Sequence, residues 1–168
     1  MRSFLQPWND YNQAIAILTT KKEKFTHLLQ SVLLPHCDLL VNIKTEKSFL
    51  SKLTRKPANE IHDVLRAAIL TNTNQETIDI VFNLKQKIQV VECDHKEVED
   101  VLGYRGSYHL KIKIEGTICE VQVMPKSLWS MKEILHNRYE TVREGKPLDK
   151  SVRAFSRFMY NTIGKSVE

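Results

Sequence analysis

Cysteines are few in this sequence, and long hydrophobic runs are missing. The three cysteines, Cys37, Cys93 and Cys119, are odd in number and form no C-x-x-C pair. This disfavours a disulfide framework and a zinc site and favours a reducing cytosol. The longest apolar runs, VLLP and CDLLV, are far shorter than the roughly 20 residues that span a bilayer. No apolar segment behind a basic start indicates a signal peptide. We therefore expect a cytoplasmic protein with no membrane association.

Internal repeats and low-complexity tracts are also missing. The chain has 168 residues, of which 42% are hydrophobic and 27% charged, which is typical of a folded globular protein. We expect one domain over residues 1–168, with an N-terminal helix within 1–35, a core over 38–143 and a C-terminal helix over 149–163. The net charge of +5 favours nucleotides or RNA as partners, although it also suits any basic soluble protein.

Hydrophobic spacing predicts alternating helices and strands. The segment 61–70 is ambiguous, because its alanines favour a helix while its length and flanks favour a buried strand. The acidic segment 94–100 is expected to be a loop. The other expected elements are helices at 8–34, 45–56, 74–87, 125–143 and 149–163, strands at 38–44 and 88–93, and a hairpin of 107–114 and 117–124. This order predicts an α+β fold with a mixed sheet of about five strands flanked by helices.

Lys44, Ser48 and Lys52 follow one another at four-residue steps where a strand runs into a helix, with Thr45 as the expected N-cap. Lysines near a helix N-terminus can bind phosphate together with the backbone N–H groups and the helix dipole. The alternative is an ordinary solvated helix face.

Two carboxylates lie in apolar surroundings. Asp63 interrupts the apolar segment IHDVL, and Glu120 shares one side of a strand with Gln122. A buried aspartate needs a partner, and either Arg66 or Lys52 could pair with it. If the fold brings Asp63 and Glu120 together, they could hold Mg²⁺, which takes oxygen ligands and shares them with substrate phosphates.

An aromatic residue precedes the hairpin, and two lysines lie on its first strand. Tyr104 could stack on a base, whereas Lys111 and Lys113 alternate with isoleucines and face either phosphates or solvent. A third set, Glu133, His136 and Glu140, has helical spacing. We interpret it as a charged helix face rather than a metal site.

Taken in order, these motifs resemble the synthetase domain of the RelA/SpoT-type alarmone synthetases, over roughly residues 38–143. The chain length resembles the small stand-alone members and the toxin-like or phage-borne relatives. The motifs are K-x-x-x-S-x-x-x-K (Lys44, Ser48, Lys52), Asp63 in an apolar segment, Gly103-Tyr104, and E-x-Q (Glu120-Val121-Gln122). The resemblance implies a nucleotidyltransferase-like α+β fold. It also implies Mg²⁺-dependent transfer of the β,γ-pyrophosphate of ATP to the 3′-hydroxyl of a guanine nucleotide.

The resemblance also implies roles for individual residues. Asp63 and Glu120 would hold Mg²⁺, and Glu120 would also assist deprotonation of the attacking hydroxyl. The ATP phosphates would be bound by Lys44, Ser48, Lys52 and Arg66. The acceptor would be bound by Tyr104, Arg105, His109, Lys111 and Gln122.

Several positions depart from the family pattern. Asn42 and Ala68 stand where arginines are usual, Met124-Pro125 replaces Arg-Thr, and one extra residue precedes His109. Three alternatives therefore stay open: an adenine nucleotide as acceptor, the 3′ CCA end of tRNA as acceptor, or a catalytically inactive domain that binds a nucleotide, RNA or protein. A homo-oligomer or an antitoxin-like partner is also compatible with the resemblance.

Overall fold

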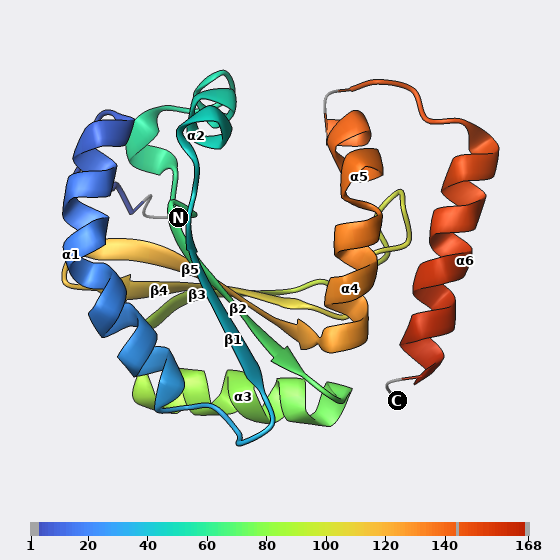
Figure 1. The fold of residues 1–168 in the computed structure, drawn as a ribbon, viewed down its shortest axis with the longest axis horizontal. Coiled ribbons are helices and arrows are strands. Elements are labelled where there is room, and N and C mark those ends of the chain that lie inside the picture. Colours follow the sequence, from blue (N-terminus) through green and yellow to red (C-terminus); the bar gives the residue numbers. More distant parts are fainter. Residues whose placement is uncertain (1–3, 144, 167–168) are drawn as a thin grey trace.

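Five strands form one mixed sheet in the computed structural model, which describes residues 4–143 and 145–166 (Figure 1). The strand order is β1-β2-β5-β4-β3. β2 and β5 are parallel, and the other neighbours are antiparallel. The strands are β1 (Asp38–Ile43), β2 (Leu65–Thr71), β3 (Val90–His95), β4 (Tyr108–Ile114) and β5 (Thr117–Pro125). This confirms the predicted α+β fold with a five-stranded mixed sheet. Residues 1–3, 144 and 167–168 of the predicted domain lie outside the described residues.

The helices cover both faces of this sheet. They are α1 (Tyr11–Gln30), α2 (Glu46–Leu53), a short 3-10 turn η1 (Ala58–Glu60), α3 (Asn74–Lys87), α4 (Lys126–Ile134), α5 (His136–Arg143) and α6 (Lys150–Ser166). In Figure 1, α1 and α3 lie on one side of the sheet, and α4, α5 and α6 lie on the other. None of the helices that the structure describes is long and apolar enough to cross a membrane.

Side-chain caps fix where several helices begin. Thr45 caps α2 by accepting a hydrogen bond from the backbone N–H of Ser48 at 3.4 Å, as predicted. Asp10 caps α1 in the same way. At α3, Thr73 and Glu76 form a reciprocal capping box. Each cap satisfies N–H groups that have no partner within the helix and contributes about 1 kcal/mol.

The ambiguous segment 61–70 contains strand β2, which begins at Leu65. β2 pairs with β1 on one side and β5 on the other. Pairing and burial therefore outweigh the helix propensity of Ala67 and Ala68. The small alanine side chains suit a central strand with helices packed on both faces.

Alternation along the strands gives the sheet two different faces. On the α1/α3 face, Leu65, Ile69 and Val121 pack against α1 residues such as Phe25 in the larger core cluster. Burying a side chain such as Phe25 contributes roughly 1.5–3 kcal/mol. On the opposite face, a second cluster lies at one end of the strands. It joins Ala68, Leu70, Leu102 and Met124 to Leu128, Met131 and Leu135 and to Tyr160 of α6. Most of the rest of that face carries polar groups, although Ile118 of β5 is also buried there.

Two local predictions were wrong. The helix expected over 125–143 is two helices, α4 and α5, which meet at the buried Leu135. β3 continues to His95 into the expected loop, because the backbone of Lys96 bonds to Ser107 and extends the pairing. α6 packs back onto the domain through Tyr160, Met159 and Ile163, whereas Phe155 and Phe158 are exposed.

Candidate active site

A row of polar residues crosses all five strands on the face opposite α1 and α3. The strand registers align these residues in the order Asn42, Arg66, Glu120, Lys111 and Glu92. Because side chains alternate along a strand, this polar row follows directly from the pairing. The next row on the same face contains Gln122 and His109 as direct neighbours. Glu120 and Gln122 therefore belong to a shared polar surface of the sheet.

A buried triad lies where β1 ends and β2 is about to begin. Lys44 directly follows β1, Lys52 lies in the last turn of α2, and Asp63 precedes β2. Oδ2 of Asp63 lies 3.0 Å from Nζ of Lys44 and 2.6 Å from Nζ of Lys52. The side chains of Lys44 and Asp63 are only 7% and 9% exposed. Sequence reasoning offered Lys52 as one ion-pair partner of Asp63, and the structure adds Lys44.

The charges of this triad depend on one another. Burial alone would raise the pKa of the Asp63 carboxyl, but the charges and hydrogen bonds of Lys52 and Lys44 lower that pKa to about 2. Burial lowers the pKa of Lys44, and the Asp63 carboxylate opposes this effect. Asp63 is therefore ionised at neutral pH. Its negative charge stabilises the protonated form of Lys44, which burial alone would disfavour.

More positive charges surround the triad. Burial is the largest cause of the lowered pKa of Lys44. Repulsion from Lys52 and Arg66 also lowers this pKa, whereas Asp63 raises it. Burial is likewise the largest cause of the lowered pKa of Lys56, and repulsion from Lys52 and Lys111 lowers it further. Several cations therefore converge on a single buried carboxylate. Such an excess of positive charge suits a polyanion such as a triphosphate.

One oxygen of Asp63 is available for a further partner. Oδ1 is buried and has no hydrogen-bond partner among the described residues. A buried carboxylate oxygen without a partner is costly, and a metal ion or a substrate group would satisfy it. Asp63 is thus suited to ligate a divalent cation through oxygen, and Glu120 is the other carboxylate predicted for this task.

A second group of polar side chains surrounds Glu120. Nε2 of Gln122 donates a hydrogen bond to Oε1 of Glu120 at 2.6 Å, and Nζ of Lys132 donates to Oε1 of Gln122 at 2.5 Å. Nζ of Lys132 also lies 4.9 Å from the centre of the Trp129 ring and 5.9 Å from that of the Tyr104 ring. Burial lowers the pKa of Lys132, and the Glu120 carboxylate opposes this. The chain Lys132–Gln122–Glu120 therefore fixes the orientation of the Glu120 carboxylate.

Tyr104 and His109 border this group. The Tyr104 hydroxyl donates to Oγ of Ser107 at 2.7 Å and lies 3.5 Å from Nε2 of His109. The Tyr104 ring contacts Tyr160 of α6 edge to face at 5.7 Å between ring centres. Burial raises the pKa of Tyr104 to about 12 and lowers that of His109. Both side chains are therefore neutral at pH 7, and each can donate or accept a hydrogen bond with a polar ligand.

Arg66 connects the two groups. It is the register partner of Glu120, and its charge acts on both Lys44 and Lys132. Arg66 is thus close enough to both groups for its charge to affect the pKa of Lys44 and that of Lys132.

Three other predicted residues have different surroundings. Ser48 is exposed, and its hydroxyl accepts a hydrogen bond from the Thr45 hydroxyl at 3.1 Å. Arg105 is exposed and lies 3.8 Å from a carboxylate oxygen of Glu99. Lys111 pairs with Glu92 at 2.7 Å. The roles assigned to these residues stay predictions.

Sequence reasoning missed Lys132 and Lys56. Lys132 follows Trp129 by three residues, so both lie on one face of α4. That spacing is visible in the sequence. Only the packing of α4 against the sheet shows that the face is turned toward Gln122.

No protein-family model and no curated protein matches this chain. Solved structures do match it. Small alarmone synthetase 2 from Bacillus subtilis has a TM-score of 0.65 and 21% identity, over 93% of this chain and 89% of that one. Small alarmone synthetase 1 from Bacillus subtilis, bound to its product pppGpp, has a TM-score of 0.63 and 20% identity, over 93% and 90%. The Type VI effector Tas1, in complex with its immunity protein, has a TM-score of 0.67 and 14% identity, over 92% and 96%. The chain therefore has the fold of the small alarmone synthetases.

Proposed function

We propose that this protein is a Mg²⁺-dependent pyrophosphokinase that transfers the β,γ-pyrophosphate of ATP to the 3′-hydroxyl of a guanine nucleotide. The observation that carries the proposal is the position of Arg66. It is the register partner of Glu120, which Gln122 orients, and its charge acts on Lys44 of the lysine–aspartate triad. Transfer of this kind depends mainly on positioning and on neutralisation of charge, and these two groups supply both.

The triad side is assigned to ATP. Lys52 is the more accessible of the two lysines, with 23% of its side chain exposed, so it can contact phosphate while Lys44 stays buried beside Asp63. Lys56 and Arg66 add positive charge around the same position. Asp63, through Oδ1, and Glu120 would hold Mg²⁺. When bound, Mg²⁺ would neutralise phosphate charge and stabilise the leaving group.

The Glu120 side is assigned to the acceptor. The Tyr104 ring offers a stacking surface for the base, and His109 and Gln122 offer hydrogen bonds. Glu120, oriented by Gln122, accepts the proton of the 3′-hydroxyl. The 3′-oxygen then bonds to the β-phosphorus of ATP. The bond from that phosphorus to the α–β bridging oxygen breaks, and AMP leaves with the electron pair.

The choice of acceptor is supported by a solved structure of the same fold. That synthetase was crystallised with its product pppGpp, which makes a guanine nucleotide the first acceptor to test. The similarity to a Type VI effector held by an immunity protein keeps a toxin-like relative, with tRNA or an adenine nucleotide as acceptor, as the second candidate. The net charge of +5 is compatible with either acceptor.

The test uses ATP labelled in the pyrophosphate group, Mg²⁺, and GDP, GTP, ATP or deacylated tRNA as acceptor, with products separated by chromatography. We expect label on the guanine nucleotides. Glu120→Gln should abolish transfer with an unchanged circular dichroism spectrum. Glu115→Gln, at the exposed turn of the same hairpin, is the matched control and should retain activity. Full activity of Glu120→Gln would refute the mechanism.

A domain that binds nucleotide without catalysis is the alternative. It is motivated by Asn42, Ala68 and Met124, which stand where the resemblance leads us to expect arginines. This alternative is correct if ATP binds in equilibrium dialysis but none of the acceptors receives label. Label on tRNA alone would identify the toxin-like activity instead.

A further inference from the structure

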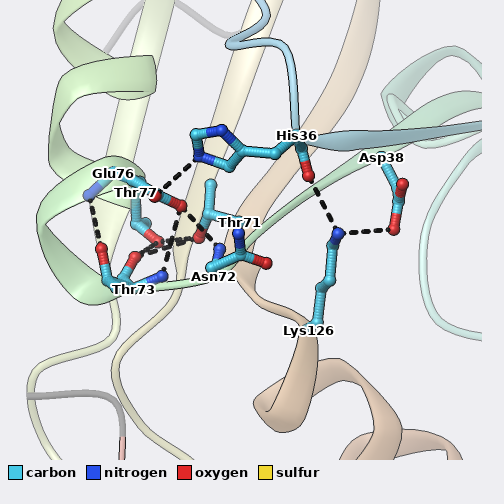
Figure 2. Close-up of polar contacts among 8 residues, drawn as sticks. All are labelled: His36, Asp38, Thr71, Asn72, Thr73, Glu76, Thr77 and Lys126. Atoms are coloured by element: carbon cyan, nitrogen blue, oxygen red, sulfur yellow. Dashed lines mark hydrogen bonds and ion pairs between the residues drawn. The ribbon is translucent and has the colours of Figure 1, made fainter.

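Three potential metal ligands meet far from Asp63. His36 and Cys37 come from the loop before β1, and Glu76 comes from the first turn of α3. Each offers one ligand atom, and these atoms all lie within 4.8 Å of one another. Figure 2 shows the His36 ring directed at Glu76, with Nε2 at 2.7 Å from Oε1. The fold therefore gathers a nitrogen, a sulfur and an oxygen donor at one point.

The Glu76 carboxylate is held in place by the backbone. Its Oε2 accepts hydrogen bonds from the N–H groups of Asn72 at 2.7 Å and Thr73 at 3.4 Å (Figure 2). In return, the Thr73 hydroxyl accepts from the N–H of Glu76 at 3.2 Å. Oε1 is left facing His36. A carboxylate oriented in this way by neighbouring hydrogen bonds is the arrangement that supports metal ligands in known sites.

The His36–Cys37 segment is anchored as well. Nζ of Lys126 donates to the carbonyl oxygen of His36 at 2.9 Å and pairs with Asp38 at 3.0 Å (Figure 2). The N–H of Cys37 donates to the carbonyl of Leu34 at 3.0 Å. Asp38 offsets part of the positive charge of Lys126 near the cluster. Both sides of the cluster thus have fixed backbones.

We propose that His36, Cys37 and Glu76 bind Zn²⁺ through Nε2, Sγ and Oε1, with a fourth position open to water. Zinc–ligand bonds of about 2.0–2.3 Å bring ligand atoms to within about 4 Å of one another, so small side-chain movements suffice. Mixed nitrogen, sulfur and oxygen donors favour zinc over Mg²⁺, which prefers oxygen alone. Binding releases the Cys37 thiol proton to solvent. The thiolate and the carboxylate together then neutralise the ion.

The cluster lies at the opposite end of β2 from the proposed active site. Asp63 precedes Leu65, the first residue of β2, whereas Asn72 and Glu76 follow Thr71, its last residue. Seven strand residues at about 3.3 Å each span roughly 20 Å. The proposed zinc site is therefore separate from catalysis. It links the α1–β1 loop to the start of α3.

The first experiment is equilibrium dialysis of the reduced protein against Zn²⁺ alone. We expect one zinc ion per chain. Cys37→Ser, His36→Ala and Glu76→Gln should each weaken binding by more than about tenfold. Glutamine still supports a capping box, so Glu76→Gln removes the ligand charge while the start of α3 keeps its cap. Cys93→Ser is the matched thiol control, and Glu120→Gln, which is expected to keep the parent fold, tests the active site. Both should bind zinc like the parent protein.

The second measurement is the absorption spectrum with Co²⁺ in place of zinc. A thiolate-to-cobalt charge-transfer band in the parent and in Cys93→Ser, and its loss in Cys37→Ser, would support the site. The parent band does not depend on whether any variant folds. Absence of zinc binding by the parent would overturn the proposal. So would unchanged binding by Cys37→Ser, or loss of binding in Glu120→Gln.

Discussion

Replacing Asp63 by asparagine should destabilise the protein strongly. Asparagine has nearly the same shape but no charge, so packing is kept while Lys44 loses its counter-ion. The Lys44 side chain is 7% exposed and lies 3.0 Å from Asp63. Removing one partner of a buried ion pair typically costs about 3–5 kcal/mol, because an uncompensated charge remains in the interior. We expect a decrease of that size in the free energy of unfolding at pH 7.

The pH dependence should identify the cause. In the parent, the pKa of Asp63 is lowered from 3.8 to about 2. A carboxyl with a lowered pKa stabilises the fold above its unfolded pKa, and this contribution is lost as the pH falls through the folded pKa. It amounts to roughly 2 kcal/mol lost between about pH 4 and pH 2. Asp63→Asn should lack this loss.

At alkaline pH the variant should recover. Burial already lowers the pKa of Lys44, and removal of Asp63 lowers it further. As the pH rises, Lys44 then loses its proton in the folded state before it does so in the unfolded state. The unfolded state binds more protons in that range, so stability rises with pH. The difference between Asp63→Asn and the parent should therefore shrink between pH 7 and the ordinary lysine pKa.

The measurement is urea unfolding followed by far-ultraviolet circular dichroism across this pH range. Asp79→Asn, an exposed position on α3, is the control and should change stability little. Combining Asp63→Asn with Lys44→Met should restore part of the lost stability, because the buried charge is gone. A decrease below about 1 kcal/mol that is equal at acid and alkaline pH would refute the reasoning.

Two further predictions concern α4 and the Tyr104 segment. Lys132→Met should raise the KM for the acceptor about tenfold while the KM for ATP stays within about twofold. The reason is that Gln122 loses the donor that orients it, a loss of about 1–3 kcal/mol. Steady-state kinetics measures both KM values, and an equal rise in the two would contradict the assignment. Gly103→Ala should destabilise more than Gly106→Ala in thermal unfolding. Both glycines have positive φ, at 93° and 82°, but only at Gly103 would the new Cβ meet Arg157 of α6, at 2.8 Å from its Cα, whereas nothing lies within 4 Å at Gly106. Equal effects of the two substitutions would rule out that contact.

Features that depend on nearby residues could be predicted from the sequence. The cap of Thr45 and the helix at 74–87 follow from a few adjacent residues and agree with the structure. The hairpin turn at Glu115-Gly116 also agrees, since both residues adopt positive φ. The break at the buried Leu135 could not be predicted in this way, because no glycine or proline marks it in the sequence.

The parts of the site that were missed depend on contacts between distant segments. Asp63 was identified because a charge in an apolar segment needs a partner, but the choice of Lys44 as that partner depends on how β1 lies against β2. Lys132 was missed because ten residues of strand and helix separate it from Gln122. The zinc proposal reverses a sequence-based expectation for the same reason, since Glu76 joins His36 from 40 positions away.

The parallel pairing of β2 with β5 has a consequence for how the protein is made. Arg66 and Glu120 are neighbours in the sheet, yet Glu120 is synthesised only after α3, β3 and β4. The triad of Lys44, Lys52 and Asp63 needs only β1, α2 and the start of β2, so it can form early on a growing chain. The acceptor side must wait for the long-range pairing, which is intrinsically slow because a large loop has to close. The complete polar surface therefore exists only once β5, the last strand, has been inserted at the centre of the sheet.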